Sequence, residues 1–206
     1  MWSLPGPFSS RFCALVPVDV MLIVTDLAPL ITLAAAQRLG YLLYPALLVV
    51  IPDAVFYDSM RQIDKLRAQE IIDWRRAPIG AMRIEPAQAL KNELERLTRR
   101  SGRMEKDLGG RAAVESIRNY PLAEEERAIL LSNDRDVDRV VDPQKVSVLT
   151  TGDYPRQLEE AHRIQSADAV FEAAGERGRH PPTHELWSQH GPEIRDAMRA
   201  AIGRGH

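Results

Sequence analysis

The chain has 206 residues, of which 45% are hydrophobic and 27% charged, and its formal net charge is −2. The composition is that of an ordinary globular protein, and the near-neutral charge excludes a general attraction to nucleic acid, so any such binding needs a local basic patch. The length suits one domain with a sizeable core. The single cysteine, Cys13, cannot form an intrachain disulfide, which fits a reducing, cytoplasmic compartment. No apolar run approaches the length of a membrane span.

Residues 1–20 differ from the rest because they are rich in Pro, Gly and Ser and show no hydrophobic period. We expect a disordered extension here, or a start codon assigned too early. Residues 21–24 then form a short apolar run that is typical of a strand covered on both faces. Asp26 follows this strand directly, and Pro29 suits the first turn of the next helix. A helix cap and a functional site at the strand's carboxyl end explain Asp26 equally well.

The remaining pattern alternates between apolar runs and helical periods. We predict strands over residues 46–51, 81–84, 127–132 and 146–150. We predict helices over residues 53–76, 87–100, 112–117, 154–164, 167–174 and 185–202, with a turn at Gly109 and Gly110. This alternation predicts a three-layer α/β/α sandwich with a mainly parallel sheet. The domain is expected to span residues 21–164, and residues 165–206 to form a helical C-terminal extension.

Four aspartates lie near the predicted strand ends. Asp26, Asp134 and Asp153 come just after buried strands, and Asp58 lies early in the helix after another. Each alone is better explained as a cap or turn residue. If the strands are adjacent and parallel, however, these acids converge on one edge of the sheet, where mutual repulsion favours a hard divalent cation such as Mg²⁺ or Mn²⁺. Because no phosphate-binding loop motif is present, this pattern favours metal-dependent phosphodiester hydrolysis over nucleotide binding.

The chain resembles a known family in several ordered blocks. Two early segments, VTDLAPLITLAAA and VVIPDAVFYDSM, resemble the opening of a PIN domain. The later blocks of that family resemble DLGGRAAVE, AILLSNDRDV and VSVLTTGDYPRQL, so the resemblance covers about residues 21–162. It implies an Mg²⁺- or Mn²⁺-dependent endoribonuclease, often the toxin of a toxin–antitoxin pair. The implied partners are RNA, a small antitoxin and a second copy of the chain.

The resemblance assigns roles residue by residue. Asp26, Asp134 and Asp153 match acids that hold the metal, and Asp58 stands where the family more often has a glutamate. At two further acid positions this chain has Gly110 and Asn133 instead. These two departures keep a second hypothesis open, in which the protein is a catalytically degenerate binding or regulatory module.

Two other groups of residues have both a functional and a simpler explanation. In the nuclease hypothesis Arg99 and Arg100, at the end of a predicted helix, hold RNA phosphates, although such a cluster is usually a solvated helix end. Ser132 and Thr151 have the chemistry of nucleophiles, but neither has an identifiable histidine and acid partner.

Overall fold

A computed structural model describes residues 19–44, 47–62, 65–76, 82–100, 107–124 and 126–180. Residues 1–18, from the predicted extension, lie outside the described residues, as does the helix predicted over 185–202.

Within the described residues, five strands form one sheet in the order β3-β2-β1-β4-β5, and every neighbouring pair is parallel. The strands are β1 Asp19–Thr25, β2 Leu48–Pro52, β3 Met82–Glu85, β4 Glu126–Leu131 and β5 Val146–Leu149. The predicted parallel sheet is confirmed. Its first strand begins two residues earlier than predicted, because Asp19 and Val20 pair with Glu126 and Arg127 of β4.

Helices connect the strands and cover both faces of the sheet. They are α1 Leu27–Ala35, α2 Asp53–Gln62, α3 Lys65–Arg76, α4 Gln88–Arg99, α5 Leu108–Asn119, α6 Asp153–Glu160 and α7 Ala167–Glu176, with short 3₁₀ helices η1 Leu39–Leu43 and η2 Arg135–Arg139. The single helix predicted over residues 53–76 is instead described as two, α2 and α3. The 3₁₀ helix after β4 was not predicted, since five residues are too few to show a helical period.

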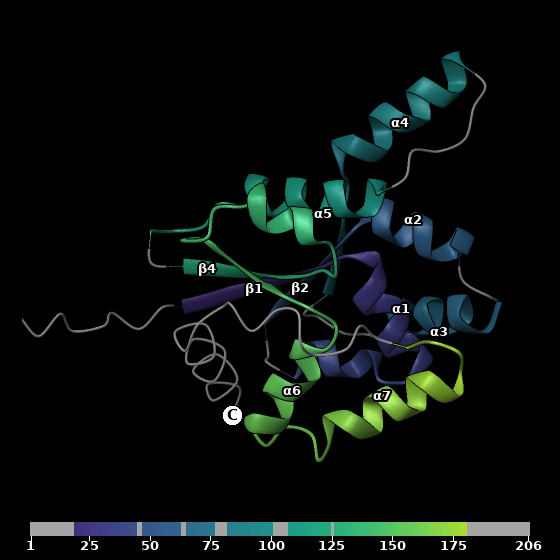
Figure 1. Cartoon of the computed structure of the whole chain (residues 1–206). Helices are drawn as coiled ribbons and strands as arrows, with labels where there is room; N and C mark the ends of the chain where they lie inside the picture. The colour runs from purple at the N-terminus through teal and green to yellow at the C-terminus, as the bar shows by residue number, and fades with distance from the viewer. Residues whose placement is uncertain are drawn as a thin grey trace, which may run out of the picture.

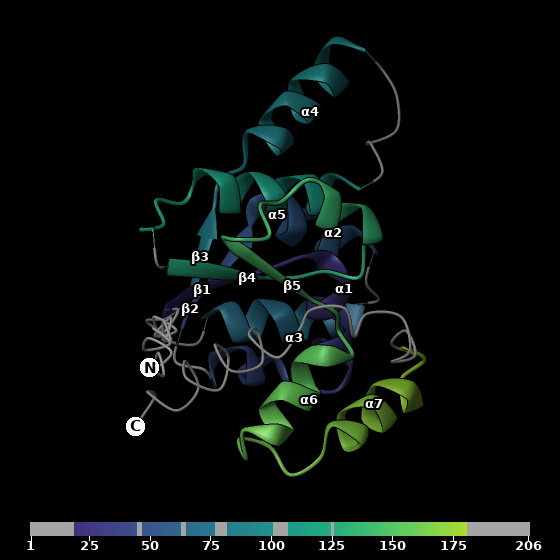
Figure 2. The ribbon, with the colours of Figure 1, turned by 60° about the vertical axis from the view of Figure 1, so that its left-hand side comes forward.

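The sheet lies between two helical layers (Figures 1 and 2). On one face α5 packs against β1, β2 and β4, while α1, α3, α6 and α7 lie on the other. Strand side chains alternate between these layers, as they must along a pleated strand. On β1, for example, Ile23 belongs to the cluster under α1, and Leu22 and Val24 belong to the cluster under α5. The predicted three-layer architecture is confirmed.

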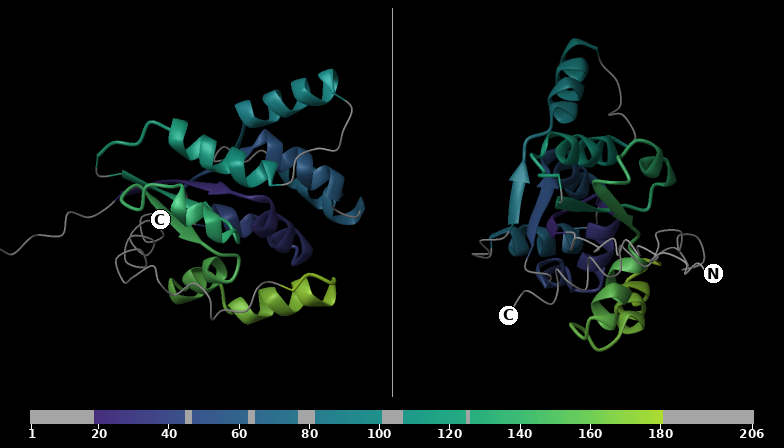
Figure 3. Two further views of the ribbon diagram at one scale, coloured as in Figure 1. Left: turned by 45° about the horizontal axis from the view of Figure 1, so that its top comes forward. Right: turned by 90° about the vertical axis from the view of Figure 1, so that its left-hand side faces the viewer.

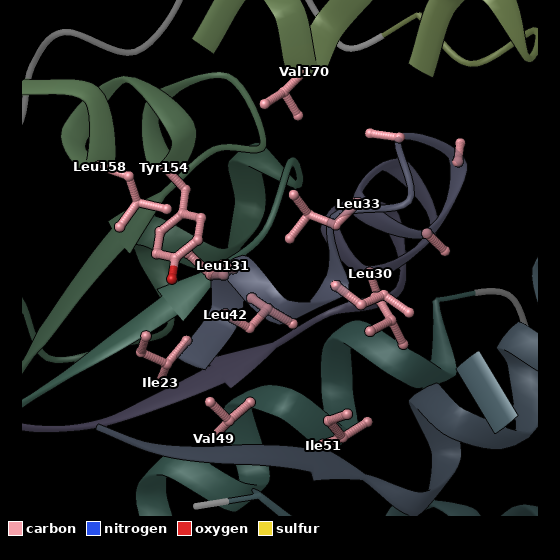
Figure 4. Packing of buried hydrophobic residues seen from close by; sticks show 14 of the residues in the cluster. Ile23, Leu30, Leu33, Leu42, Val49, Ile51, Leu131, Tyr154, Leu158 and Val170 are labelled. Carbon is pink, nitrogen blue, oxygen red and sulfur yellow. The ribbon is translucent and has the colours of Figure 1, made fainter. Parts of the chain in front are cut away.

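The larger hydrophobic cluster draws the C-terminal helices into the domain (Figure 4). Tyr154 of α6 is buried there, and its hydroxyl donates a hydrogen bond to the Tyr41 carbonyl oxygen at 2.9 Å. Val170 and Ala174 of α7 belong to the same cluster. The described part of the predicted C-terminal extension therefore packs into the core of the domain.

Helix α4 projects away from the sheet (Figures 1 and 3). Its first turn is anchored by Ala89 and Leu90, which are buried against α5, whereas Leu94 is 42% exposed. Among the described helices none has both the length and the apolar character to cross a membrane.

Candidate acidic site at the carboxyl edge of the sheet

The ends of three neighbouring strands are tied together by backbone hydrogen bonds. The N–H of Asp26, just after β1, donates to the Leu131 carbonyl oxygen of β4 at 2.9 Å. The N–H of Ser132, just after β4, donates to the Leu149 carbonyl oxygen of β5 at 3.0 Å. Because the strands are parallel and end at this edge, the residues that follow them emerge side by side, as expected for a ligand crevice in an open α/β sheet.

Asp26 is fixed by contacts to both of its carboxylate oxygens. Oδ1 accepts a hydrogen bond from the Leu27 N–H at 2.6 Å, and Oδ2 accepts one from the Ser132 hydroxyl at 3.1 Å. The Ser132 oxygen in turn accepts the Asp134 N–H at 3.1 Å. Asp26 therefore caps α1 and also points toward a second acidic residue. Ser132, which the sequence suggested only as a weak nucleophile candidate, links the two.

A cavity of about 280 Å³ lies at this edge, and we call it the acid pocket. It is lined by Asp26, Leu27, Ala28, Ile31, Asp58, Asp107, Gly109, Gly110, Asp134 and Arg179. Three of the four acids predicted from the sequence, Asp26, Asp58 and Asp134, thus share one pocket. Asp58 is 7% exposed on α2, whereas Asp134 is exposed at the start of η2.

Asp107 is a fourth carboxylate of the acid pocket, and sequence reasoning missed it. It is the residue before α5, with a left-handed backbone (φ 62°), and its side chain forms no capping hydrogen bond. A short acidic residue directly before a small-residue helix is a standard cap pattern, and this is the signal that could have drawn attention to it. Its position in the pocket comes from the path of α5, which packs along α2.

The predicted turn at Gly109 and Gly110 is wrong, because both residues lie in the first turn of α5. A Cβ atom at Gly109 would lie 3.2 Å from Asp26 Oδ1 and 3.3 Å from a methyl carbon of Val55. At Gly110 it would lie 3.8 Å from Asp26 Oδ2. The glycine pair therefore lets the start of α5 approach Asp26 closely, with the positive end of the helix dipole near the carboxylate.

The electrostatics of the acid pocket favour a cation. Burial raises the pKa of the Asp26 carboxyl above its ordinary value, and the nearby carboxylates of Asp134 and Asp107 raise it further. The hydrogen bonds from Leu27 and Ser132 lower the pKa and only partly offset these effects. The ionised form of Asp26 is therefore disfavoured, and a positive charge in the pocket would stabilise it.

Asp153, the fourth predicted acid, lies at the same edge of the sheet but does not line the acid pocket. Its Oδ2 accepts hydrogen bonds from the Thr150 N–H at 3.2 Å and the Thr150 hydroxyl at 2.7 Å. Nearby, the Asn133 side-chain oxygen accepts the Thr151 N–H at 2.8 Å. Asp153 and Asn133 therefore both hold the loop after β5.

The predicted RNA-binding arginines lie elsewhere, at the end of the projecting α4. Arg99 pairs with Glu95 at 3.6 Å and lines a separate cavity beside Asp53, and Arg100 follows the last residue of the helix. Neither lines the acid pocket. Their role in holding RNA stays a prediction.

The acid pocket suits an ion that keeps part of its water shell better than an ion bound by protein side chains alone. In the part of the chain that the structure describes, no group of three or more His, Cys, Asp or Glu side chains is gathered closely enough to hold a metal ion. Mg²⁺ commonly keeps several waters and uses only one or two carboxylates together with substrate phosphate. Asp26 and Asp134 offer carboxylate oxygens of the kind that such an ion prefers, whereas the described lining of the pocket contains no His or Cys for a closed zinc site.

Comparison with protein-family models, with curated proteins and with solved structures gave no match to this chain. What is established is a fold, an all-parallel five-stranded α/β sheet flanked by helices, with a carboxylate-lined pocket at its carboxyl edge.

Proposed function

We propose that this protein is an Mg²⁺- or Mn²⁺-dependent endoribonuclease of the PIN type. One observation carries the proposal: Asp26, Asp58 and Asp134, which come from three of the blocks that resemble that family, line a single pocket. RNA as the substrate and a small antitoxin as a partner come from the resemblance, as does pairing with a second copy of the chain. All three stay predictions.

The side chains of the acid pocket have separable roles in this proposal. Asp26 and Asp134 hold the cation. Ser132 fixes their relative positions, because its hydroxyl donates to the Asp26 carboxylate and accepts the Asp134 N–H. Asp58 and Asp107 add negative charge to the same pocket. A bound Mg²⁺ or Mn²⁺ would supply a water of lowered pKa and stabilise charge on a phosphodiester oxygen.

A degenerate binding or regulatory module is the second candidate, and two observations favour it. Position 110 carries no side chain where the family has an acid, and Asn133, at the other lapsed acid position, has its side-chain oxygen bound by the Thr151 N–H. If this candidate holds, the sheet and the pocket persist without hydrolysis.

Cleavage of RNA in the presence of Mg²⁺, Mn²⁺ or a chelator decides between the two candidates. We expect Asp26→Ala to reduce metal-dependent cleavage at least a hundredfold, since the cation and its water are then misplaced. The matched control is Glu172→Gln, which removes an exposed carboxylate of α7 outside the pocket and should leave cleavage unchanged.

Wild-type cleavage that survives chelation, or that persists in Asp26→Ala, would refute the nuclease proposal. If the wild type shows no cleavage, the double variant Gly110→Glu with Asn133→Asp tests the degenerate module, because it restores both lapsed acids. A Cβ at Gly110 makes only an ordinary contact with Asp26, so the glutamate has room at its root.

A further inference from the structure

A basic side chain lies in the acid pocket beside the four carboxylates. Among the described residues that line this pocket, Arg179 is the one Lys or Arg. It follows helix α7, which packs along α1. No motif in the sequence marks this residue.

Arg179 is positioned by a defined helix ending. Gly178 has the left-handed backbone (φ 75°) that glycine adopts without strain, its N–H donates to the Gly175 carbonyl oxygen at 2.8 Å, and the Arg179 N–H donates to the Ala174 carbonyl oxygen at 2.9 Å. This pair of bonds is the Schellman ending of a helix. The chain is thereby turned back toward α1.

The side chain of Arg179 is then oriented by α1. Its Nε donates to the hydroxyl oxygen of Thr32 at 3.2 Å, and that hydroxyl, which is buried, donates to the Ala28 carbonyl oxygen at 2.9 Å. Arg179 itself is half-buried. The end of α7 therefore fixes the Arg179 backbone, Thr32 of α1 holds its side chain, and the residue lines the pocket.

A phosphodiester needs such a group here. Carboxylates alone repel RNA, and a cation held by them neutralises only part of this charge. A phosphate has two non-bridging oxygens. With a metal ion present, one can face the ion while the other accepts a hydrogen bond from the guanidinium, and without metal both can accept from it in bidentate fashion.

We propose that Arg179 is the residue that binds the RNA backbone phosphate in the acid pocket. The choice of RNA as ligand rests on the proposed function, whereas the placement of the guanidinium does not. This assigns the phosphate contact to the end of α7, in addition to the predicted Arg99 and Arg100.

The test measures binding of a short fluorescent single-stranded RNA to the full chain in chelator, where no metal-dependent cleavage interferes. Arg179→Gln should weaken binding roughly tenfold and lower the slope of log affinity against log salt by about 1. The RNA affinity of Arg179→Lys should lie between those of the wild type and Arg179→Gln, since lysine keeps the charge but not the bidentate geometry. Arg177→Gln is the matched control: it lies at the same helix end and removes the same charge, but pairs with Glu70 at 3.0 Å and does not line the pocket.

The Mn²⁺-induced shift in Tm, measured for the same variants, checks that the pocket still forms. Equal RNA binding by Arg179→Gln and Arg177→Gln would overturn the proposal. So would an Arg179→Gln variant with unchanged RNA affinity and a larger Mn²⁺ shift, since Arg179 would then be a counter-ion for the acids. Arg179-dependent binding by a wild type that cleaves nothing would support the phosphate site and reject the nuclease.

Discussion

The carboxyl edge of the sheet has two halves that use the same residue types differently. After β1 and β4, Asp26 and Asp134 face a pocket shared with two further acids, and the pKa of Asp26 is raised. After β5, Asp153 accepts two hydrogen bonds from Thr150, and the Asn133 side chain accepts the Thr151 N–H of the same loop. Asp26 and Asp134 also accept backbone N–H groups, from Leu27 and Asp136, so these two carboxylates both cap their own segments and line the pocket, whereas Asp153 holds its loop and does not line the pocket.

The largest expected effect on stability is the difference between alanine substitutions at two adjacent glycines beside the acid pocket. Gly109→Ala should lower the free energy of unfolding by about 1–3 kcal/mol, because its Cβ crowds Asp26 and Val55. Gly110→Ala has room for its Cβ and should stabilise the helix by up to about 1 kcal/mol. Urea denaturation of both variants measures the difference, and equal losses would mean that α5 does not approach Asp26 in this way.

The loop after β5 gives the next largest effect. Asp153→Ala removes both bonds from Thr150 and should cost about 1–2 kcal/mol of unfolding free energy. Its Mn²⁺-induced rise in Tm should stay as in the wild type, because Asp153 does not line the pocket. Loss of that response in this variant would instead support the sequence-based prediction that Asp153 holds the metal.

Divalent cations that bind in the acid pocket should stabilise the folded protein by mass action. A cation at ten times its Kd adds roughly 1.4 kcal/mol to the unfolding free energy if it binds only the native state. Asp26→Asn should weaken this response, since it removes one ligand charge. Identical melting curves with and without Mg²⁺ or Mn²⁺, for the wild type and for Asp26→Asn, would count against a formed metal site.

The smallest effect concerns the pH dependence of stability in chelator. The folded pKa of Asp26 is raised, so ionisation of this carboxyl is less favourable in the native than in the unfolded state. Above the folded pKa, Asp26→Asn should therefore have a higher Tm than the wild type. This advantage should shrink as the pH falls through the folded pKa and vanish below the ordinary value near 3.8, where both states bind the proton. A constant difference across this range would reject the raised pKa.

The sequence by itself determined the order of strands and helices, since apolar runs and helical periods are local patterns. It also predicted that Asp26, Asp58, Asp134 and Asp153 lie near one edge, because residues that follow parallel strands must emerge there. It placed strand and helix ends less well, as with the early start of β1 at Asp19, where pairing with β4 extends the strand.

Only the tertiary structure decided which groups share the acid pocket. Asp107 carries only a helix-cap pattern and Arg179 has no motif, and both join the pocket because α5 packs on α2 and α7 packs on α1. Asp153 lies in a segment that resembles the family well, yet its carboxylate oxygen accepts a hydrogen bond from the nearby Thr150 hydroxyl. Hydrogen-bond competition within a loop and the packing of distant helices depend on three-dimensional distances, which the one-dimensional spacing of residues does not contain.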